Sequence, residues 1–391
     1  MLNTEFSPWP SFTEEEIDAV SRVLRSNKVN YWTGSECREF EKEFAAWSQC
    51  AYGVALSNGT LALDLALRVL GIGAGDEVVV TPRTFLASAS SIVTAGATPV
   101  FADVERDSQN ISEQSVRAVL SPRTKAILCV HLAGWPCEMD EIIALANENN
   151  IYVIEDCAQA HGAKYKGRSV GSFGQVAAWS FCQDKIITTG GEGGMLTTSS
   201  KLLWSRAWSY KDHGKSWDAV YNREHAPGFR WLHESFGSNW RMIEMQAVIG
   251  RIQLGRMMEW HAARERNANR ISDMAREVSA LRVPDVPEYI DHAWYRNYIF
   301  INQQALRGDW SRDRIVYEMN QKGVPCFSGS CPEVYLEKAF DNTGYRPKER
   351  LPVARELGET SLMFLVHPTL RESQIEKTCD VLSQVMKSAQ R

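Results

Sequence analysis

The sequence predicts an α/β fold in which a large part, built on a mostly parallel sheet covered by helices, precedes a smaller C-terminal α+β part. Three observations predict it. Short apolar segments alternate with helical periods from about residue 52 to residue 180. These segments are apolar throughout, as in parallel sheets that are buried on both faces. A long helical pattern that begins near residue 241 then ends the alternation.

The first half of the chain supplies the expected strands and helices in turn. YGVALS (52–57) leads into the helical TLALDLALRVL (60–70), and the strand VVVT (78–81) precedes a small-residue helix over about 85–96. The pattern repeats in the strands PVFADV and KAILCVHLA, the helix MDEIIALANENN and the strand IYVIED, and a further strand covers 176–181. Ligands of such sheets bind at the carboxyl ends of the strands, so a site is expected at that edge.

The C-terminal third predicts a second, smaller domain. Its long helix from residue 241 is followed by strand-like LRVPDVPEYIDHAWYRNYIFIN and by two amphipathic helices, SRDRIVYEMNQKGVPC and RESQIEKTCDVLSQVMKSA. The boundary is expected between residues 255 and 280. We predict a large domain over 26–255 and a small domain over 256–391.

Composition limits the classes of function. The 391 residues are 44% hydrophobic and 23% charged, with a net charge of −5, which argues against a nucleic-acid-binding surface. The acidic N-terminus has no signal-peptide core, and no apolar run approaches 18 residues, so a cytoplasmic protein with no membrane partner is predicted. Nine scattered cysteines indicate reduced thiols, with neither a disulfide framework nor a metal site.

One segment, AAWSFCQDKIITTGGEGGMLTTS (177–199), places a single lysine, Lys185, between an apolar strand and two glycine pairs. Alone it is equally consistent with a hairpin whose loop lysine is simply solvated. Neither G-x-x-x-x-G-K-[ST] nor G-x-G-x-x-G is present, so a nucleotide-binding loop is not predicted. A lysine retained for covalent chemistry is the remaining interpretation.

Further polar and aromatic residues follow the other strands of the predicted sheet. Asp156 closes IYVIED, Phe85 follows VVVT, and Gly59 and Thr60 open a helix whose N-terminal N–H groups suit an anion. Each has an ordinary alternative as a cap, turn or core residue. Together with Lys185 they match pyridoxal phosphate, which needs a lysine, a carboxylate for the pyridine nitrogen and a phosphate-binding helix start.

The chain resembles the DegT-type sugar aminotransferases, a family of fold type I. The resemblance lies in SNGTLAL, TFLASASSIVTAGATPVFADV, IEDCAQAHGAKYKGRSVGSFG, WSFCQDKIITTGGEGGMLTT and GSNWRMIEMQAVIGRIQL, over roughly residues 10–260. It implies a cytoplasmic, pyridoxal-5′-phosphate-dependent homodimer that takes its amino group from glutamate. It also implies that residues 1–25 pack on the small domain.

The resemblance assigns roles to eight residues. Lys185 is the Schiff-base lysine and the catalytic base, and Asp156 pairs with the pyridinium. The remaining six contact the cofactor: Gln159 beside its phenolic oxygen, Phe85 on its ring, Gly59, Thr60 and Ser180 at its phosphate, and Asn239 at the phosphate of the neighbouring subunit. His161 is equally a structural histidine and is not assigned to the site.

The substrate is predicted from departures from the family pattern. GVPCFSGSCPEVY (323–335) and SLMFLVHP (361–368) differ from relatives that aminate nucleotide-linked keto-sugars. Arg83, directly before Thr84-Phe85, suits a carboxylate, although a surface salt bridge or the carboxylate of glutamate are alternatives. Together with VNYWTG (29–34) and the segment 210–240, these features make the chain resemble aminotransferases that act on the 8-oxo form of 3-deoxy-manno-octulosonate, aminated for lipopolysaccharide, and the resemblance implies that substrate. Trp32, Phe327 and Phe364 are then expected to narrow the site. A nucleotide-linked 3- or 4-keto-sugar is the alternative.

Two other classes of protein are alternatives to an aminotransferase. Dehydratases that resemble this family carry a histidine in place of the lysine, whereas this chain retains Lys185. A non-enzymatic regulator with this fold would lack the visible absorbance of a lysine-bound cofactor.

Overall fold

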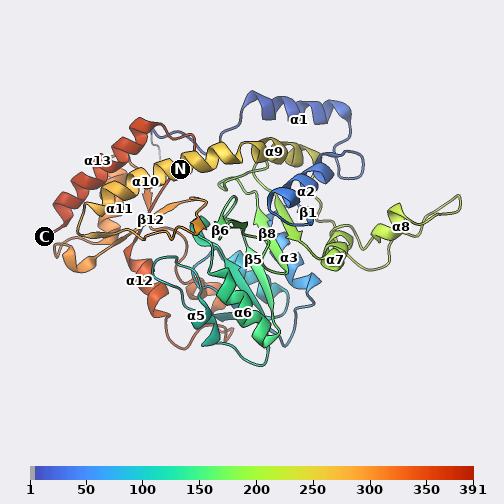
Figure 1. Ribbon diagram of the computed structural model, residues 1–391, viewed down its shortest axis with the longest axis horizontal. Coiled ribbons are helices and arrows are strands. Elements are labelled where there is room, and N and C mark those ends of the chain that lie inside the picture. The colour runs from blue at the N-terminus through green and yellow to red at the C-terminus, as the bar shows by residue number, and fades with distance from the viewer. Residues whose placement is uncertain (1–4) are drawn as a thin grey trace.

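The computed structural model describes residues 5–391 and shows two packed parts, each built around a sheet (Figure 1). The larger part contains a seven-stranded sheet in the order β1-β9-β8-β5-β4-β2-β3. Its strands are β1 (Tyr52–Leu56), β2 (Glu77–Val80), β3 (Thr98–Phe101), β4 (Thr124–Val130), β5 (Tyr152–Asp156), β8 (Val176–Ser180) and β9 (Gly194–Thr198).

The sheet is parallel except for one strand. β3, β2, β4, β5 and β8 run in the same direction, and β9 is antiparallel to both of its neighbours, β8 and β1. The predicted mostly parallel sheet is therefore confirmed. β9 reverses direction because only residues 181–193 separate it from β8, and that turn contains no crossover helix to return the chain for a parallel strand.

Successive strand residues face two different layers of helices. In β2, Val78 and Val80 pack with one layer and Val79 packs with the other, as the two-residue period of a strand requires. The first layer is α3 (Gly59–Val69), α4 (Ala87–Thr94) and α7 (Lys201–Lys211). The second layer is α2 (Glu36–Trp47), α5 (Glu113–Arg117), α6 (Met139–Asn149) and α9 (Glu244–Gly255).

The smaller part has an antiparallel sheet in the order β10-β12-β14-β13. Its strands are β10 (Leu281–Arg282), β12 (Asn297–Ile301), β13 (Cys326–Phe327) and β14 (Ser361–Phe364). Its helices are α10 (Met257–Arg276), α11 (Arg312–Gln321), α12 (Pro352–Thr360) and α13 (Glu372–Ala389). The short strands β6 (Lys164–Tyr165), β7 (Arg168–Ser169) and β11 (Ile290–Asp291) form a third sheet. Short 3-10 helices are η1 (Leu132–Gly134), η2 (Gln303–Ala305), η3 (Val334–Leu336) and η4 (Lys338–Phe340).

The predicted boundary between domains falls at the junction of α9 and α10. α9 ends at Gly255 and α10 begins at Met257, so the chain passes between the two parts through nearly continuous helix. α10 and α13 pack together in the core of the smaller part. The division into domains of 26–255 and 256–391 remains a prediction.

The N-terminal segment contacts both parts. Ser7 Oγ donates to Gln374 Oε1 in α13 at 3.1 Å, and Gln374 Nε2 donates to the Glu5 carbonyl at 2.8 Å. Helix α1 (Glu14–Ser26) instead packs along α9, where Arg256 and Glu16 form an ion pair of 2.9 Å. The described start of the segment thus lies on the smaller part and α1 on the larger; residues 1–4, also in the predicted packing range, lie outside the described residues.

A segment after α7 extends away from both parts (Figure 1, right). It contains the short helix α8 (Trp217–Tyr221) and a loop that returns near residue 240. Phe229, Trp231 and Phe236 on this loop are largely exposed, Phe236 to 99%. Such a group of exposed aromatic side chains indicates a surface that another molecule covers.

Helices in the described part of the chain are either too short or too polar to cross a bilayer.

Candidate active site

The carboxyl ends of the parallel strands carry most of the predicted site residues. Asp156 is the last residue of β5 and Ser180 the last of β8, while Phe85 lies between β2 and α4. Lys185 lies in the turn between β8 and β9. The parallel register brings these ends to one edge of the sheet, as the order of strands and helices predicts.

Asp156 is a buried carboxylate held by two hydrogen bonds. Ser88 Oγ donates to its Oδ2 at 2.8 Å, and the Ala158 N–H donates to its Oδ1 at 3.1 Å. Burial raises the pKa of Asp156, and these hydrogen bonds together with the charge of Lys185 oppose the shift only in part. A cation placed against this carboxylate would therefore stabilise its ionised form strongly, because the site is poorly solvated.

Lys185 is largely buried and lies beside an acidic and an aromatic side chain. Its Nζ is 3.6 Å from Asp184 Oδ1 and 5.1 Å from the centre of the Tyr295 ring. Burial alone would lower the pKa of Lys185, but Tyr295 and Asp184 more than offset this effect and the net shift is upward. The free side chain is thus held as an ammonium group close to Asp156.

Helix α3 begins directly against the end of β8. Its N-cap, Asn58, accepts a hydrogen bond from the Leu61 N–H at 3.0 Å. A Cβ on Gly59 would lie 2.6 Å from Ser180 Cβ, so only glycine permits this close approach. Thr60 is exposed at the helix start. The first N–H groups of the helix, with the hydroxyls of Thr60 and Ser180, form a cradle suited to a phosphate.

Two further predicted residues differ in how firmly they are held. Gln159 is buried, and its Oε1 accepts the Ala133 N–H at 2.8 Å, which fixes the side chain next to Asp156. Phe85 is 70% exposed, which is unusual for an aromatic ring beside a buried edge. A planar ligand stacked on Phe85 would cover this apolar surface.

Asn239 lies where the projecting segment returns to the end of β1, since the carbonyl of the next residue, Trp240, accepts the Ser57 N–H at 3.0 Å. It is exposed at the base of the projecting segment, where it pairs with Asp212 in a single β-bridge. No side-chain hydrogen bond within residues 5–391 links it to the rest of the site. The structure contains a single chain and therefore does not test the predicted contact of Asn239 with a neighbouring subunit.

The sequence suggests Arg83 as a residue that binds a substrate carboxylate, but its side chain is turned into the protein. The side chain is completely buried, with Nε donating to Gln109 Oε1 at 2.8 Å and Nη2 donating to Ser361 Oγ at 3.1 Å. A surface salt bridge is excluded, because none of the carboxylates of residues 5–391 pairs with it. Arg83 instead joins the end of β2 to β14 of the smaller part.

The three aromatic residues expected to narrow the site lie in different places. The prediction that Phe364 narrows the site is wrong, because its ring is fully buried in the core of the smaller part. Trp32 packs edge-on against Trp208 beside α7. Phe327 is partly exposed in β13.

Sequence reasoning missed several residues that support the lysine and the carboxylate. Ser88 lies one helical turn after Thr84 and reaches Asp156. Tyr295 donates its O–H to Asp184, and Arg296 Nη2 lies 3.5 Å from the same carboxylate. The position of Ser88, three residues after Phe85 in a predicted helix, could have indicated that it faces the site. Tyr295 lies more than 100 residues after Lys185, and no sequence pattern indicates that the two are close.

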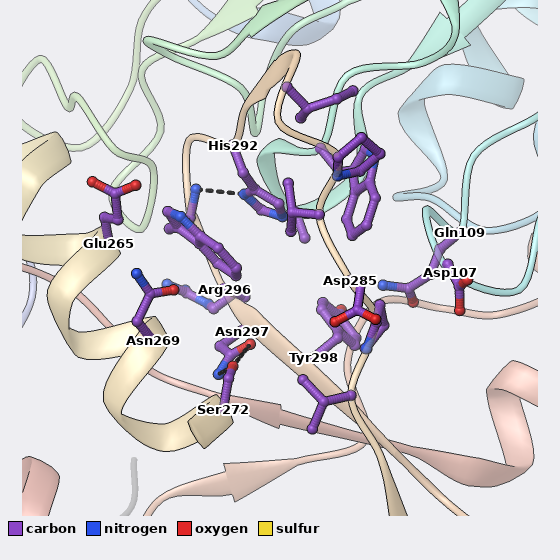
Figure 2. Close-up of a pocket in the computed structure, with 18 of the residues that line it drawn as sticks. Asp107, Gln109, Glu265, Asn269, Ser272, Asp285, His292, Arg296, Asn297 and Tyr298 are labelled. Atoms are coloured by element: carbon purple, nitrogen blue, oxygen red, sulfur yellow. Dashed lines mark hydrogen bonds between the residues drawn. The ribbon is translucent and has the colours of Figure 1, made fainter. Parts of the chain in front are cut away.

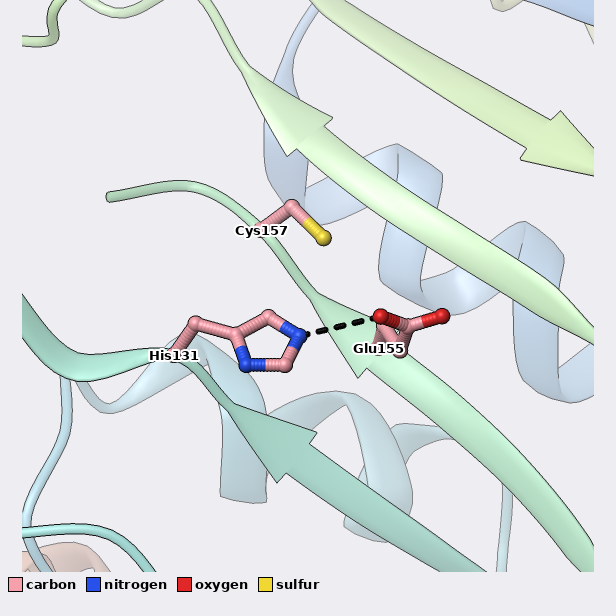
Figure 3. A group of neighbouring side chains, drawn as sticks. All are labelled: His131, Glu155 and Cys157. Carbon is pink, nitrogen blue, oxygen red and sulfur yellow. Dashed lines mark hydrogen bonds and ion pairs between the residues drawn. The ribbon is translucent and has the colours of Figure 1, made fainter. Parts of the chain in front are cut away.

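A buried group of His131, Glu155 and Cys157 lies beneath the same edge (Figure 3). The Cys137 N–H donates to His131 Nδ1 at 3.0 Å, so Nε2 carries the proton and donates to Glu155 at 3.0 Å. Glu155 also accepts N–H groups from the loop 171–174. Burial raises the pKa of the Cys157 thiol well above its usual range. These hydrogen bonds make the group a structural network that fastens the loop to β5.

A separate cavity of about 390 Å³ lies between the two parts (Figure 2). Gln109, Trp135, His292, Arg296 and Tyr298 are among its lining residues. None of the eight predicted site residues lines it, so it is distinct from the edge that carries Lys185 and Asp156.

These features fit pyridoxal 5′-phosphate. A buried carboxylate, a lysine close to it, an exposed aromatic ring and a glycine-permitted helix start correspond to the pyridine nitrogen, the aldehyde, the ring face and the phosphate of that cofactor. Gln159 is fixed by a backbone N–H and is therefore ready to meet a polar ring substituent.

Comparison with known proteins gives a consistent result. The model of the DegT/DnrJ/EryC1/StrS aminotransferase family matches residues 10–383. GDP-perosamine synthase of Caulobacter vibrioides is 35% identical over 349 residues, 89% of each chain. dTDP-3-amino-3,4,6-trideoxy-α-D-glucose transaminase of Streptomyces venezuelae is 32% identical over 367 residues, 94% of this chain and 90% of the relative.

A solved structure described as the aminotransferase from Psychrobacter cryohalolentis is 63% identical, with a TM-score of 0.96 over 98% of this chain and 99% of that one. Aminotransferases of this fold type use pyridoxal 5′-phosphate. The family match spans nearly the whole chain, including both parts and every predicted site residue. The chain is an aminotransferase and belongs to the DegT/DnrJ/EryC1/StrS aminotransferase family.

Proposed function

We propose that the protein transfers an amino group from glutamate to the carbonyl carbon of an oxidised sugar, with Lys185 as the residue that binds the cofactor. The observation that carries this proposal is that Lys185, the buried carboxylate of Asp156 and the glycine-permitted start of α3 lie at the same carboxyl edge of the sheet. The cofactor, when bound, supplies the electron sink for the reaction. The chain supplies binding, orientation and proton transfer.

Each predicted residue then has a defined task. Asp156 keeps the ring nitrogen protonated, and its hydrogen bonds from Ser88 and Ala158 hold the carboxylate in place. Phe85 covers one face of the ring, and Gln159 contacts its oxygen substituent. The start of α3, with Thr60 and Ser180, binds the phosphate. Lys185 would hold the cofactor, and its Nζ, when free, would carry a proton to or from the reacting substrate carbon.

For the sugar, we propose the 8-oxo form of 3-deoxy-manno-octulosonate, which would become an 8-amino sugar for lipopolysaccharide. The support is the unusual segment 323–335 and the way it packs. The Val334 N–H donates to the Pro82 carbonyl at 2.8 Å, so this segment packs against the chain three residues before Phe85. A free eight-carbon sugar acid needs less room than a nucleotide-linked one.

A nucleotide-linked 3- or 4-keto-sugar is the second candidate. It is favoured by the names of relatives, which include a GDP-perosamine synthase and a dTDP-amino-sugar transaminase. The burial of Arg83 also removes one argument for a sugar acid, because a carboxylate could reach that side chain only if β14 moved away.

Lys185→Ala tests the reaction. The variant is expected to lose the visible absorbance of the lysine-bound cofactor and the bleaching of that absorbance by glutamate. Lys201→Ala, on the exposed start of α7, is the matched control and should keep both. Full activity and an unchanged spectrum in Lys185→Ala would disprove the assignment.

The substrate is tested with enzyme that carries the aminated cofactor. Each class of carbonyl sugar is added separately, and return of the visible absorbance marks a substrate. Return with a nucleotide-linked keto-sugar, and none with the octulosonate aldehyde, would replace the first candidate by the second. The aminotransferase assignment would be unaffected.

We also propose that the active unit is a homodimer in which Asn239 completes the partner's phosphate site. The exposed aromatic residues of the projecting segment support a covered surface there. Mixing Lys185→Ala chains with Asn239→Ala chains should restore some activity, since one hybrid site has both residues. Absence of recovery, in a preparation shown to exchange subunits, would contradict the shared site.

A further inference from the structure

The carbonyl oxygen of Lys185 is held by a residue from the N-terminal segment. Trp9 Nε1 donates a hydrogen bond to this oxygen at 2.8 Å. Among residues 5–391, Trp9 is the only side chain that donates to it. The Lys185 N–H in turn donates to the Cys182 carbonyl at 3.1 Å, so both backbone polar groups of the lysine are fixed.

The Trp9 ring is itself fixed by the smaller part. Trp260 of α10 contacts it edge-on, with ring centres 5.1 Å apart, and His367 stacks on it at 5.8 Å. The Arg264 guanidinium lies 5.0 Å from the ring centre. The direction of the indole N–H therefore depends on residues of α10 and on the segment after β14.

The backbone of Lys185 determines where its amino group can lie. The side chain is unbranched and flexible, so its Nζ is placed by the backbone and by the Asp184 and Tyr295 contacts together. A buried carbonyl left without a donor would seek another partner and shift the turn. Small displacements of a reacting group reduce rates strongly.

We propose that Trp9 is a positioning residue for Lys185, and that through its ring the smaller part and the N-terminal segment control the placement of the reactive amine. The proposal rests on the proposed role of Lys185. It adds a residue that lies outside every motif that indicates the family.

The experiment replaces only the indole N–H. At position 9, the tryptophan analogue in which sulfur replaces the ring N–H keeps the packing and removes the donor, and Trp9→Phe is the genetically simpler form. Trp47→Phe is the matched control, because it alters an aromatic cluster around Phe44 and Trp179 that does not include Trp9 and leaves the hydrogen bond from Trp9 to Lys185 intact.

Two measurements report on the ionisation of Lys185 itself, separately from overall activity. The first is the pH midpoint of the visible absorbance of the bound cofactor. The second is the pH dependence of chemical labelling of Lys185 in cofactor-free protein, read by mass spectrometry. Loss of the N–H is expected to shift both midpoints by roughly half a pH unit or more and to lower kcat about tenfold, with KM nearly unchanged.

The outcomes separate this inference from the function itself. Wild-type midpoints and kcat in the position-9 analogue would overturn the positioning role, even if Lys185→Ala is colourless and inactive. Equal shifts in the analogue and in Trp47→Phe would also overturn it, since the effect would then come from aromatic packing in general and not from the Trp9 N–H. Retained colour in Lys185→Ala would refute the function instead.

Discussion

His161 offers a test of how burial controls charge near the site. The ring is fully buried against Phe44, Trp179 and Phe181, and neither nitrogen makes a well-formed hydrogen bond among residues 5–391. Burial, and to a smaller extent the charges of Lys185 and Arg264, lower the pKa of His161 to about 3, and the Ser180 backbone opposes this only in part.

The sign of the pH effect follows from this shift. The unfolded chain takes up a proton near pH 6.5, whereas the folded chain keeps the ring neutral down to about pH 3. The contribution of His161 to stability is therefore complete above pH 6.5 and is lost as the pH falls toward 3. Between pH 7 and pH 5.5 the loss is about 1.2 kcal/mol for one such group.

His161→Leu removes the titrating ring and fills the same apolar space. Urea unfolding of the cofactor-free protein at pH 7 and pH 5.5 is the assay. Between these pH values, the free energy of unfolding of the variant should fall by about 1 kcal/mol less than that of the wild type. His233→Gln, on the exposed projecting segment, should keep the wild-type pH dependence. An identical pH dependence in His161→Leu and the wild type would refute the reasoning.

Two more substitutions test the cofactor cradle and the carboxylate. Gly59→Ala places a Cβ 2.6 Å from Ser180 Cβ, which should cost about 1–3 kcal/mol and weaken cofactor binding, measured by equilibrium titration; Gly255→Ala, with open space around it, is the control and should bind normally. Ser88→Ala removes the donor to Asp156, so cofactor binding should weaken, most strongly as the pH falls, because the pKa of that carboxyl rises further. Ser90→Ala, without that contact, should behave as the wild type; equal losses in both serine variants would contradict the assignment.

The fold could be predicted from local patterns, because each strand and helix has its own period and the parallel order follows from their alternation. β2 illustrates this, since all four of its residues are buried and apolar neighbours flank it on both faces. The antiparallel β9 follows a short turn, and the sequence stretch GGEGG allows such a turn.

The supporting residues could not be predicted, because they depend on contacts between distant segments. Trp9, Tyr295 and Ser361 reach Lys185, Asp184 and Arg83 from far along the chain. Nothing in the local sequence around Arg83 indicates that its guanidinium turns inward to β14. Motif spacing places the groups that touch a cofactor, while tertiary packing places the groups that hold them.

The junction of the two parts carries an excess of positive charge, although the chain as a whole has a net charge of −5. Arg83 and Arg264 are completely buried, and no carboxylate among residues 5–391 pairs with either. Burial lowers the pKa of Arg264 to about 9, a sign of how poorly its charge is compensated. Uncompensated buried cations are costly, and an anion nearby would reduce that cost. A phosphate-bearing cofactor bound near these arginines would bring negative charge toward them and so reduce that cost.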